Sequence, residues 1–60
     1  MVEKRYYNVD EIATYLGVRP KTIYNWVHED YIPYFKFKRL VRFEIREIEK
    51  WMNKKRRENY

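Results

Sequence analysis

Residues 8–27 read NVDEIATYLGVRPKTIYNWV, and this stretch decides the fold. Asn8 is a favourable N-cap, and Glu11 follows three residues later, which is the spacing of a capping box. Gly17 suits the left-handed conformation that often ends a helix, so we predict a first helix between Asn8 and Gly17. Its predicted buried face follows helical spacing and consists of Val9, Ile12, Ala13 and Leu16.

A second helix is predicted to begin at Pro20, because proline is favoured at the first helical position. It should end near Glu29-Asp30, ahead of Pro33. A helix, a tight turn and a second helix are the sequence form of a helix-turn-helix, whose second helix presents its polar side outward. The apolar side consists of Ile23, Trp26 and Val27, and the polar side of Lys21, Asn25 and His28, flanked by Thr22 and Tyr24.

Residues 34–43 alternate with the period of two that is typical of strands. Aromatic and β-branched residues alternate with cations over residues 35–38 and again over 41–43. We predict a two-stranded hairpin with an apolar inner face and a cationic outer face. The turn near Lys38-Arg39 contains no Gly, Asn or Asp, so the sequence leaves its type open.

A third helix is predicted from about Glu44 to about Arg57. Trp26 and Trp51 lie on apolar helix stripes, so we expect them to pack in the core rather than stack on bases. The basic residues 54–57 are either a solvated helix end or a phosphate clamp. The apolar stripe of this helix consists of Ile45, Ile48, Trp51 and Met52, and its cationic row of Arg46, Lys50, Lys54 and Arg57.

Sixty residues make a single domain, 1–60, with its core over about 6–57. The chain has no cysteine, so aromatic residues, 20% of the total, must supply the core that disulfides would otherwise support. No apolar run is long enough to span a bilayer, and the N-terminus lacks a signal-peptide core. The sequence therefore predicts an intracellular, cytoplasmic protein.

The net charge of +5 is unevenly distributed. Residues 1–30 carry a net charge of −1, and residues 31–60 carry +6. A basic half on a small domain favours a polyanionic partner such as nucleic acid. A solubility surface is the alternative that charge alone leaves open.

Catalysis is not expected from this set of side chains. The chain has no Cys and no Ser, and its threonines have no His–acid arrangement nearby in sequence. His28 is the only histidine and has no second ligand, so no metal site is expected. Gly17 is the only glycine, which excludes a glycine-rich phosphate loop. We expect no enzyme, no cofactor and no small-molecule ligand.

The order helix, turn, helix, two-stranded wing and helix resembles the winged helix-turn-helix of excisionase-type and MerR-type DNA-binding domains. The resemblance covers roughly residues 6–52 and is specific only in combination. It implies a mainly α fold with a small β-hairpin. The matching residues are Tyr7-x-Val9-x-Glu11-x-Ala13-x-Tyr15-Leu16-Gly17-Val18, Lys21-Thr22-Ile23-Tyr24-x-Trp26-Val27, Ile32-Pro33, Phe35-Lys36, Val41-Arg42-Phe43 and Ile48-Glu49-x-Trp51-Met52.

The same resemblance implies that residues 20–28 enter the major groove as a recognition helix. It also implies that the wing, residues 34–43, contacts the neighbouring backbone or the minor groove. The cations of the wing are expected to contact DNA, although edge-strand protection would also explain them. The candidate DNA-binding residues are Arg19, Lys21, Thr22, Tyr24, Asn25, His28, Lys36, Lys38, Arg39 and Arg42.

Asn25 is the expected base reader, because an amide side chain can bond to N6 and N7 of adenine together. The alternative is a solvated polar residue on an exposed helix. Tyr24 is expected either on a phosphate or packed against the wing or third helix. His28 either touches a phosphate when protonated or serves as a polar residue at a helix end. The remaining helix candidates, Arg19, Lys21 and Thr22, are expected on phosphates.

Three departures from the family pattern bear on the site. Arg19 stands where a Ser or Thr N-cap is usual, which removes a side-chain acceptor worth about 1 kcal/mol. Asp30 replaces a common glycine after the second helix, and Asp adopts the left-handed conformation less readily. Lys38-Arg39 replaces a glycine-containing wing tip.

We therefore expect sequence-selective binding of double-stranded DNA. The coiled coil and effector domain of MerR-type regulators do not follow within these residues, which favours an excisionase-like architectural or directionality factor in DNA recombination. Such a factor binds repeated sites, bends DNA and biases a recombinase or integrase, so other copies of itself are expected partners. The alternatives are a small stand-alone transcriptional regulator and a protein-interaction adaptor with a basic face.

Overall fold

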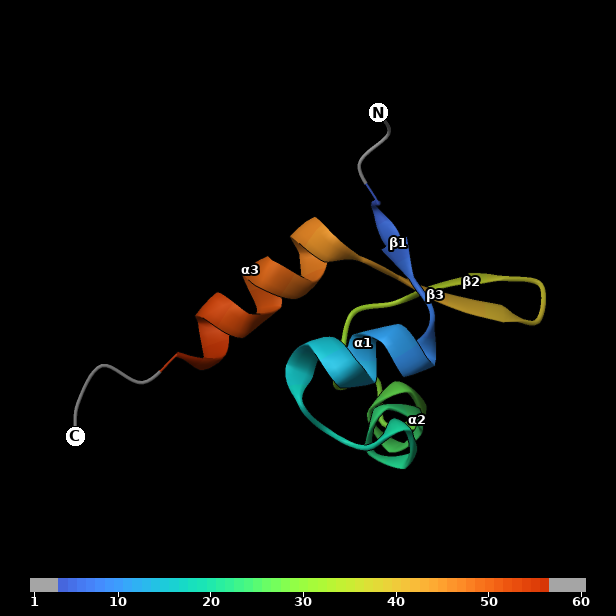
Figure 1. The fold of residues 1–60 in the computed structure, drawn as a ribbon, viewed down its shortest axis with the longest axis horizontal. Coiled ribbons are helices and arrows are strands. Elements are labelled where there is room, and N and C mark those ends of the chain that lie inside the picture. Colours follow the sequence, from blue (N-terminus) through green and yellow to red (C-terminus); the bar gives the residue numbers. More distant parts are fainter. Residues whose placement is uncertain (1–3, 57–60) are drawn as a thin grey trace.

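The computed structural model describes residues 4–56 and confirms a mainly helical winged helix-turn-helix (Figure 1). The helix-turn-helix is followed by a β-hairpin, the wing, and by a further helix. None of the helices in this part of the chain is long and apolar enough to cross a membrane. The elements are β1 (Tyr6–Tyr7), α1 (Val9–Leu16), α2 (Pro20–His28), β2 (Phe35–Phe37), β3 (Leu40–Glu44) and α3 (Ile45–Lys55).

Helix α1 begins and ends as predicted. The Glu11 amide donates to Asn8 Oδ1 at 2.8 Å, and the Asn8 amide donates to Glu11 Oε1 at 2.9 Å, which completes the capping box. Gly17 has a φ of 72°, the left-handed conformation that L side chains disfavour. The Val18 amide then donates to the Ala13 carbonyl at 2.9 Å and turns the chain toward α2.

Helix α2 is confirmed at both ends. Pro20 is its first residue, and Arg19 precedes it without any side-chain capping bond. Beyond the C-terminal end of α2, Asp30 has a φ of 55°, the left-handed conformation expected at this position. The Tyr31 amide donates to the Trp26 carbonyl at 2.8 Å and closes the turn.

The described sheet is antiparallel and has the strand order β1-β3-β2. Strand β1 was not predicted, because two residues give no readable alternation. It pairs Tyr7 with Phe43 and Tyr6 with Glu44, so the start of the chain is joined to the strand that leads into α3. The hairpin of β2 and β3 was predicted, and its two-residue turn is Lys38-Arg39.

The predicted division of the hairpin into an apolar inner face and a cationic outer face is wrong. Phe35 pairs with Arg42, and Lys36 pairs with Val41. Directly paired residues share a face of the sheet. Phe35 and Phe37 therefore lie on the face that points away from the side of the buried Phe43. They are 43% and 51% exposed.

The buried core lies between α1, α2, β3 and α3. Trp26 and Trp51 are partly buried and pack against it, as predicted, with their ring centroids 5.8 Å apart. Tyr31 completes this group at 5.3 Å from Trp26 and 5.4 Å from Trp51. Aromatic rings therefore hold α3 to α2 where a larger protein would use aliphatic layers. The core consists of Val9, Ile12, Ala13, Ile23, Ile32, Phe43 and Ile48.

Helix α3 ends at Lys55 among the described residues, and the predicted end at Arg57 lies outside them. Its N-cap, Glu44, is buried and accepts from the Glu47 amide at 3.0 Å. The same carboxylate accepts from Arg5 Nε at 3.0 Å, and this bond lowers the pKa of Glu44. Sequence reasoning missed this ion pair, because it joins residues that only β1 brings together.

The left-handed Asp30 yields a prediction about stability. Asp30→Gly is expected to raise the free energy of unfolding by about 0.5–1 kcal/mol, because glycine adopts this conformation without a Cβ clash. Removing a carboxylate from the C-terminal end of α2 acts in the same direction and outweighs the loss of the long, exposed hydrogen bond that Asp30 Oδ1 accepts from the Tyr34 hydroxyl at 3.4 Å. Urea denaturation measures the change. Glu29→Gly, where φ is −88°, is the matched control and should lower stability.

The Arg5–Glu44 pair yields a prediction about pH. Because the folded-state pKa of Glu44 lies below its ordinary value, the pair stabilises the fold above that value and this contribution is lost as pH falls through the lowered pKa. Glu44→Gln should lower the melting temperature at pH 7. The difference in melting temperature between the variant and the original protein should become smaller in acid. Melting curves across the acid range test this. An equal change in Glu49→Gln, on the exposed side of α3, would contradict the assignment.

Candidate nucleic-acid interface

The outward side of α2 is uncovered along its whole length. Tyr24 is 59% exposed, and Lys21, Asn25 and His28 are also exposed. Ile23 on the opposite side is fully buried and anchors the helix to the core. The helix is therefore held by one apolar side while its amine, phenol, amide and imidazole groups remain free.

The start of α2 carries positive charge and has no side-chain cap. Arg19 is exposed, and its carbonyl accepts from the Thr22 and Ile23 amides at 2.9 and 3.3 Å. Pro20 has no N–H, and no side chain caps the first turn. Thr22 is half-buried, so it is less accessible than its neighbour Lys21. An anion approaching this end would meet Arg19, Lys21 and the positive end of the helix dipole.

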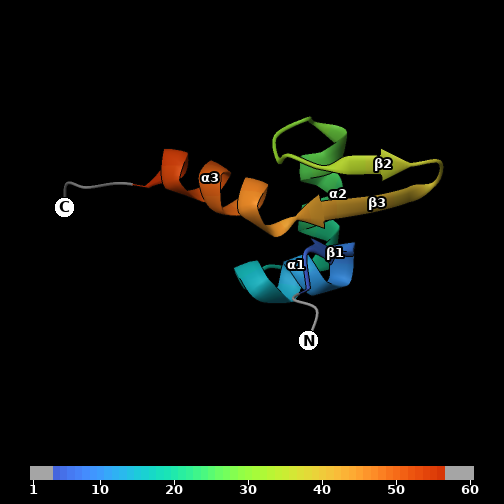
Figure 2. The same ribbon diagram turned by 90° about the horizontal axis from the view of Figure 1, so that it is seen from above.

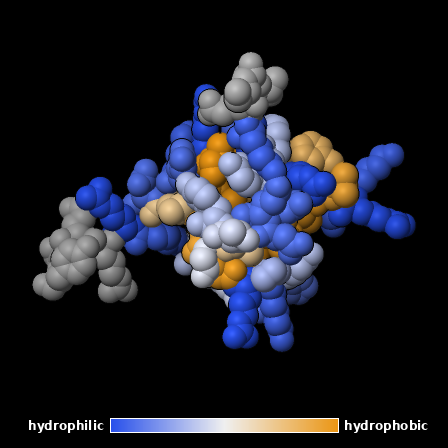
Figure 3. Space-filling view, in the orientation of Figure 1, coloured by the Kyte–Doolittle hydropathy of each residue, from blue (hydrophilic) through white to orange (hydrophobic). Residues whose placement is uncertain are grey.

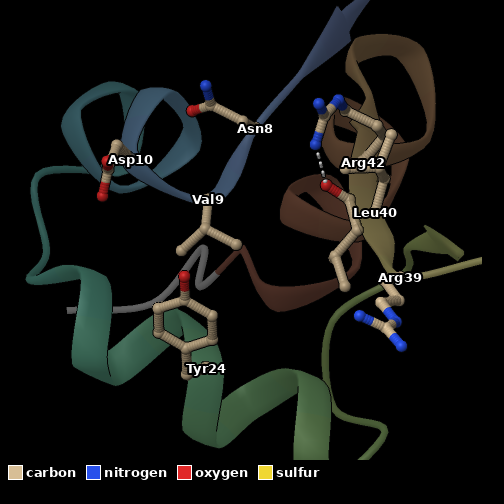
Figure 4. Close-up of a pocket in the computed structure, with 8 residues that line it drawn as sticks. Asn8, Val9, Asp10, Tyr24, Arg39, Leu40 and Arg42 are labelled. Carbon is tan, nitrogen blue, oxygen red and sulfur yellow. Dashed lines mark hydrogen bonds between the residues drawn. The ribbon is translucent and has the colours of Figure 1, made fainter.

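A hollow of about 310 Å³ separates α2 from the wing (Figure 4). In it the Tyr24 ring rises from α2 toward Val9, while Arg39 and Arg42 stand on the wing side. Tyr24 is 59% exposed, so its ring borders the wing across the hollow without being buried against it. The hollow is lined by Asn8, Val9, Asp10, Tyr24, Arg39, Leu40, Val41 and Arg42.

Arg42 is less free than sequence reasoning implied. It is half-buried, and its Nη1 donates to the Val41 carbonyl at 2.8 Å. Its charge also contributes, after a bond from Lys4 and one from the Asn8 amide, to lowering the pKa of Glu11. The guanidinium is thus oriented by its own strand and partly balanced by the acidic start of α1.

The other wing cations, Lys36, Lys38 and Arg39, are exposed. Lys38 has a φ of 56°, so the two-residue tip is formed without glycine and places a lysine in the left-handed conformation. Arg39 follows it at the edge of the hollow. Lys36 pairs with Val41, so its side chain lies on the face of the wing that is turned toward the helices.

The candidate residues thus form two groups. Tyr24, Arg39 and Arg42 meet at the hollow, whereas Arg19, Lys21 and His28 are spread along α2. Sequence reasoning missed Asn8 and Asp10 as parts of this surface, because their capping role fully explained them. The Asp10 carboxylate places negative charge on the α1 side of the hollow, across from Arg39 and Arg42, and would limit how deeply a phosphate enters it (Figure 4).

The basic end of α3 lies far from the wing. Figures 1 and 2 show α3 and the β2–β3 hairpin extending to opposite sides of the molecule. Lys54, Lys55 and Arg56 are exposed there, and Lys55 Nζ lies 4.6 Å from the centre of the Tyr31 ring. Residues 4–56 contain no group of three His, Cys, Asp or Glu side chains that could hold a metal ion.

The fold and the uncovered polar helix define the class of the protein as a DNA-binding winged helix-turn-helix. A family model described as "Helix-turn-helix domain" matches residues 6–56, and the chain belongs to this family. The match confirms the resemblance to excisionase-type domains and, in general terms, DNA as the partner. Comparison with curated proteins gave no match, and comparison with solved structures gave none either.

Proposed function

We propose that the protein binds duplex DNA sequence-selectively, with α2 in the major groove and the wing tip on the adjacent backbone or minor groove. The observation that carries this proposal is the outward side of α2, where Lys21, Tyr24 and Asn25 are exposed beside the hollow that adjoins Arg39. A helix fits the width of the major groove, and the exposed cations at the start of α2 and on the wing are available to the phosphates beside it.

The residues divide into a base reader and backbone contacts. Asn25 is the base reader, because its exposed amide offers a donor and an acceptor near the middle of α2. Arg19 and Lys21 contact phosphates at the start of the helix, and the Thr22 hydroxyl assists them. The wing contacts phosphates through Lys36, Lys38, Arg39 and Arg42. His28 lies at the far end of α2.

The biological role we propose is that of an excisionase-like architectural factor without enzymatic activity. It would bind repeated sites, bend DNA and bias a recombinase, and acting on DNA would place it in the cytoplasm. Membership of an excisionase-type family supports this role. A transcriptional regulator would use the same surface. Gel shifts on repeated sites, with and without a recombinase, separate the two roles.

Base reading by Asn25 is tested by selecting bound duplexes from a random pool. Asn25→Ala is expected to relax one position of the enriched motif and to cost about 1–3 kcal/mol at that position. Lys21→Ala is the matched control on the same helix and should weaken binding to all sequences alike. An unchanged motif with Asn25→Ala would refute the assignment.

The wing contact is tested through the salt dependence of binding. With about five phosphates contacted, log K should fall with log salt at a slope of about −4 to −5. Arg39→Ala should weaken binding and reduce the slope by about one. Lys54→Ala, at the opposite end of the molecule, is the control and should change neither. An equal loss in both variants would assign part of the contact to α3.

A further inference from the structure

The outer face of the sheet carries a second surface with different chemistry. Tyr6, Phe35, Phe37 and Leu40, which we call the aromatic face, are between 43% and 55% exposed. The Tyr6 ring meets Phe35 and Phe37 edge-on at 6.3 and 6.4 Å, and the two phenylalanine rings stack at 6.4 Å. Figure 3 shows hydrophobic side chains gathered over the β2–β3 hairpin.

The three rings of the aromatic face lie on the outer side of the sheet, and Leu40 at the wing tip also borders the hollow beside α2. Leu40, Arg42 and Glu44 alternate along β3 with Val41 and Phe43, and Phe43 is buried against the helices. Phe35, Phe37 and Tyr6 pair with the first group. Lys36, between the two phenylalanines, points to the opposite side. The rings of Tyr6, Phe35 and Phe37 line no part of the hollow beside α2, so a segment bound on them leaves the outward side of α2 free.

A hollow of about 460 Å³ continues this face toward α3. Its two carboxylates are already engaged, since Glu44 is buried against Arg5 and Glu47 lies 3.8 Å from Lys50. Arg46 is exposed and has no ion-pair partner within residues 4–56. The accessible charge of the hollow is therefore positive. It is lined by Arg5, Tyr6, Phe35, Glu44, Arg46, Glu47 and Lys50.

The size of the face and its position at a sheet edge indicate what fits there. Its exposed apolar surface comes from four side chains, each about half-exposed, whereas each partner of a stable protein–protein interface contributes roughly 800 Å² from about 20–30 residues. A short segment suits this area better than a folded surface or a second copy. Strand β2 lies at the edge of the sheet, so its outer main-chain groups are open to an added strand.

We propose that the aromatic face binds an extended, acidic segment of a partner protein, which lies along β2. Alternate apolar side chains of the segment cover Phe35 and Phe37, and its carboxylates lie at the end near Arg46 and Lys50. Main-chain bonds to the edge strand give affinity, and the two kinds of side-chain contact give specificity. DNA bound through α2 and a partner bound through β2 are then held by one small domain.

The test uses the full chain as the target for selection from a random-peptide library. Selected peptides should combine aliphatic or aromatic residues at alternate positions with Asp or Glu. A labelled selected peptide is then titrated by fluorescence anisotropy. Phe35→Thr with Phe37→Thr, which keeps strand propensity, should weaken its binding by at least about tenfold.

Two further variants make the result independent of folding. Lys36→Thr, on the same strand but the opposite face, should leave peptide affinity unchanged and weaken duplex DNA binding. The phenylalanine variant should weaken peptide binding and leave the affinity for duplex DNA unchanged. Arg46→Glu leaves the aromatic rings in place. It should weaken binding of the acidic peptide without changing the affinity for duplex DNA. In amide NMR spectra the peptide should shift β2 resonances and leave those of α2 in place.

Several results would overturn the proposal. Selected peptides without acidic residues, or peptides whose binding survives the phenylalanine variant, would remove its basis. Sedimentation that shows a dimer lost in that variant would assign the face to a second copy of the chain. Single-stranded DNA binding that is lost in the same variant would assign the face to nucleic acid.

Discussion

The burial of Ile23 in the core, where α2 packs against α1, is the contact on which the proposed DNA surface depends. Ile23 is the only fully buried residue of α2, and it shares the core with Ile12 and Phe43. No disulfide supports so small a fold, and losing one such side chain would cost about 2–5 kcal/mol. Ile23, two residues before Asn25, fixes the rotation of the helix together with the partly buried Trp26 and Val27, and this rotation sets the direction of the exposed Asn25 amide.

Local signals predicted the helices well, for a physical reason. Asn8, Gly17 and Pro20 act within a few residues of themselves, through caps and fixed dihedral angles, so their effect does not depend on the rest of the chain. The uncovered side of α2 was predictable for the same reason. The sequence could not predict which residues of other elements lie next to that side of α2. The hollow that Tyr24 and Arg39 both line depends on how the wing packs.

The error in the hairpin arose from the length of its turn. The alternation within each strand was correct, but a two-residue turn pairs Phe37 with Leu40 and so places residues 35 and 37 on the face of residues 40 and 42. A three-residue turn would have put the phenylalanines on the side of Val41 and Phe43. Because Lys38-Arg39 contains no turn-specific residue, the sequence did not fix this choice.

The pairing set by the two-residue turn also gives the two faces of the wing different kinds of side chain. Lys36 points toward the helices and the proposed DNA surface, while its neighbours Phe35 and Phe37 point away from it. Exposed aromatic side chains on an edge strand favour aggregation, so they are a cost unless something covers them. They contribute little to the core, whose seven members are all elsewhere. A segment bound along β2 would bury these rings, and their burial would contribute to its affinity. It would not compete for the surface of α2.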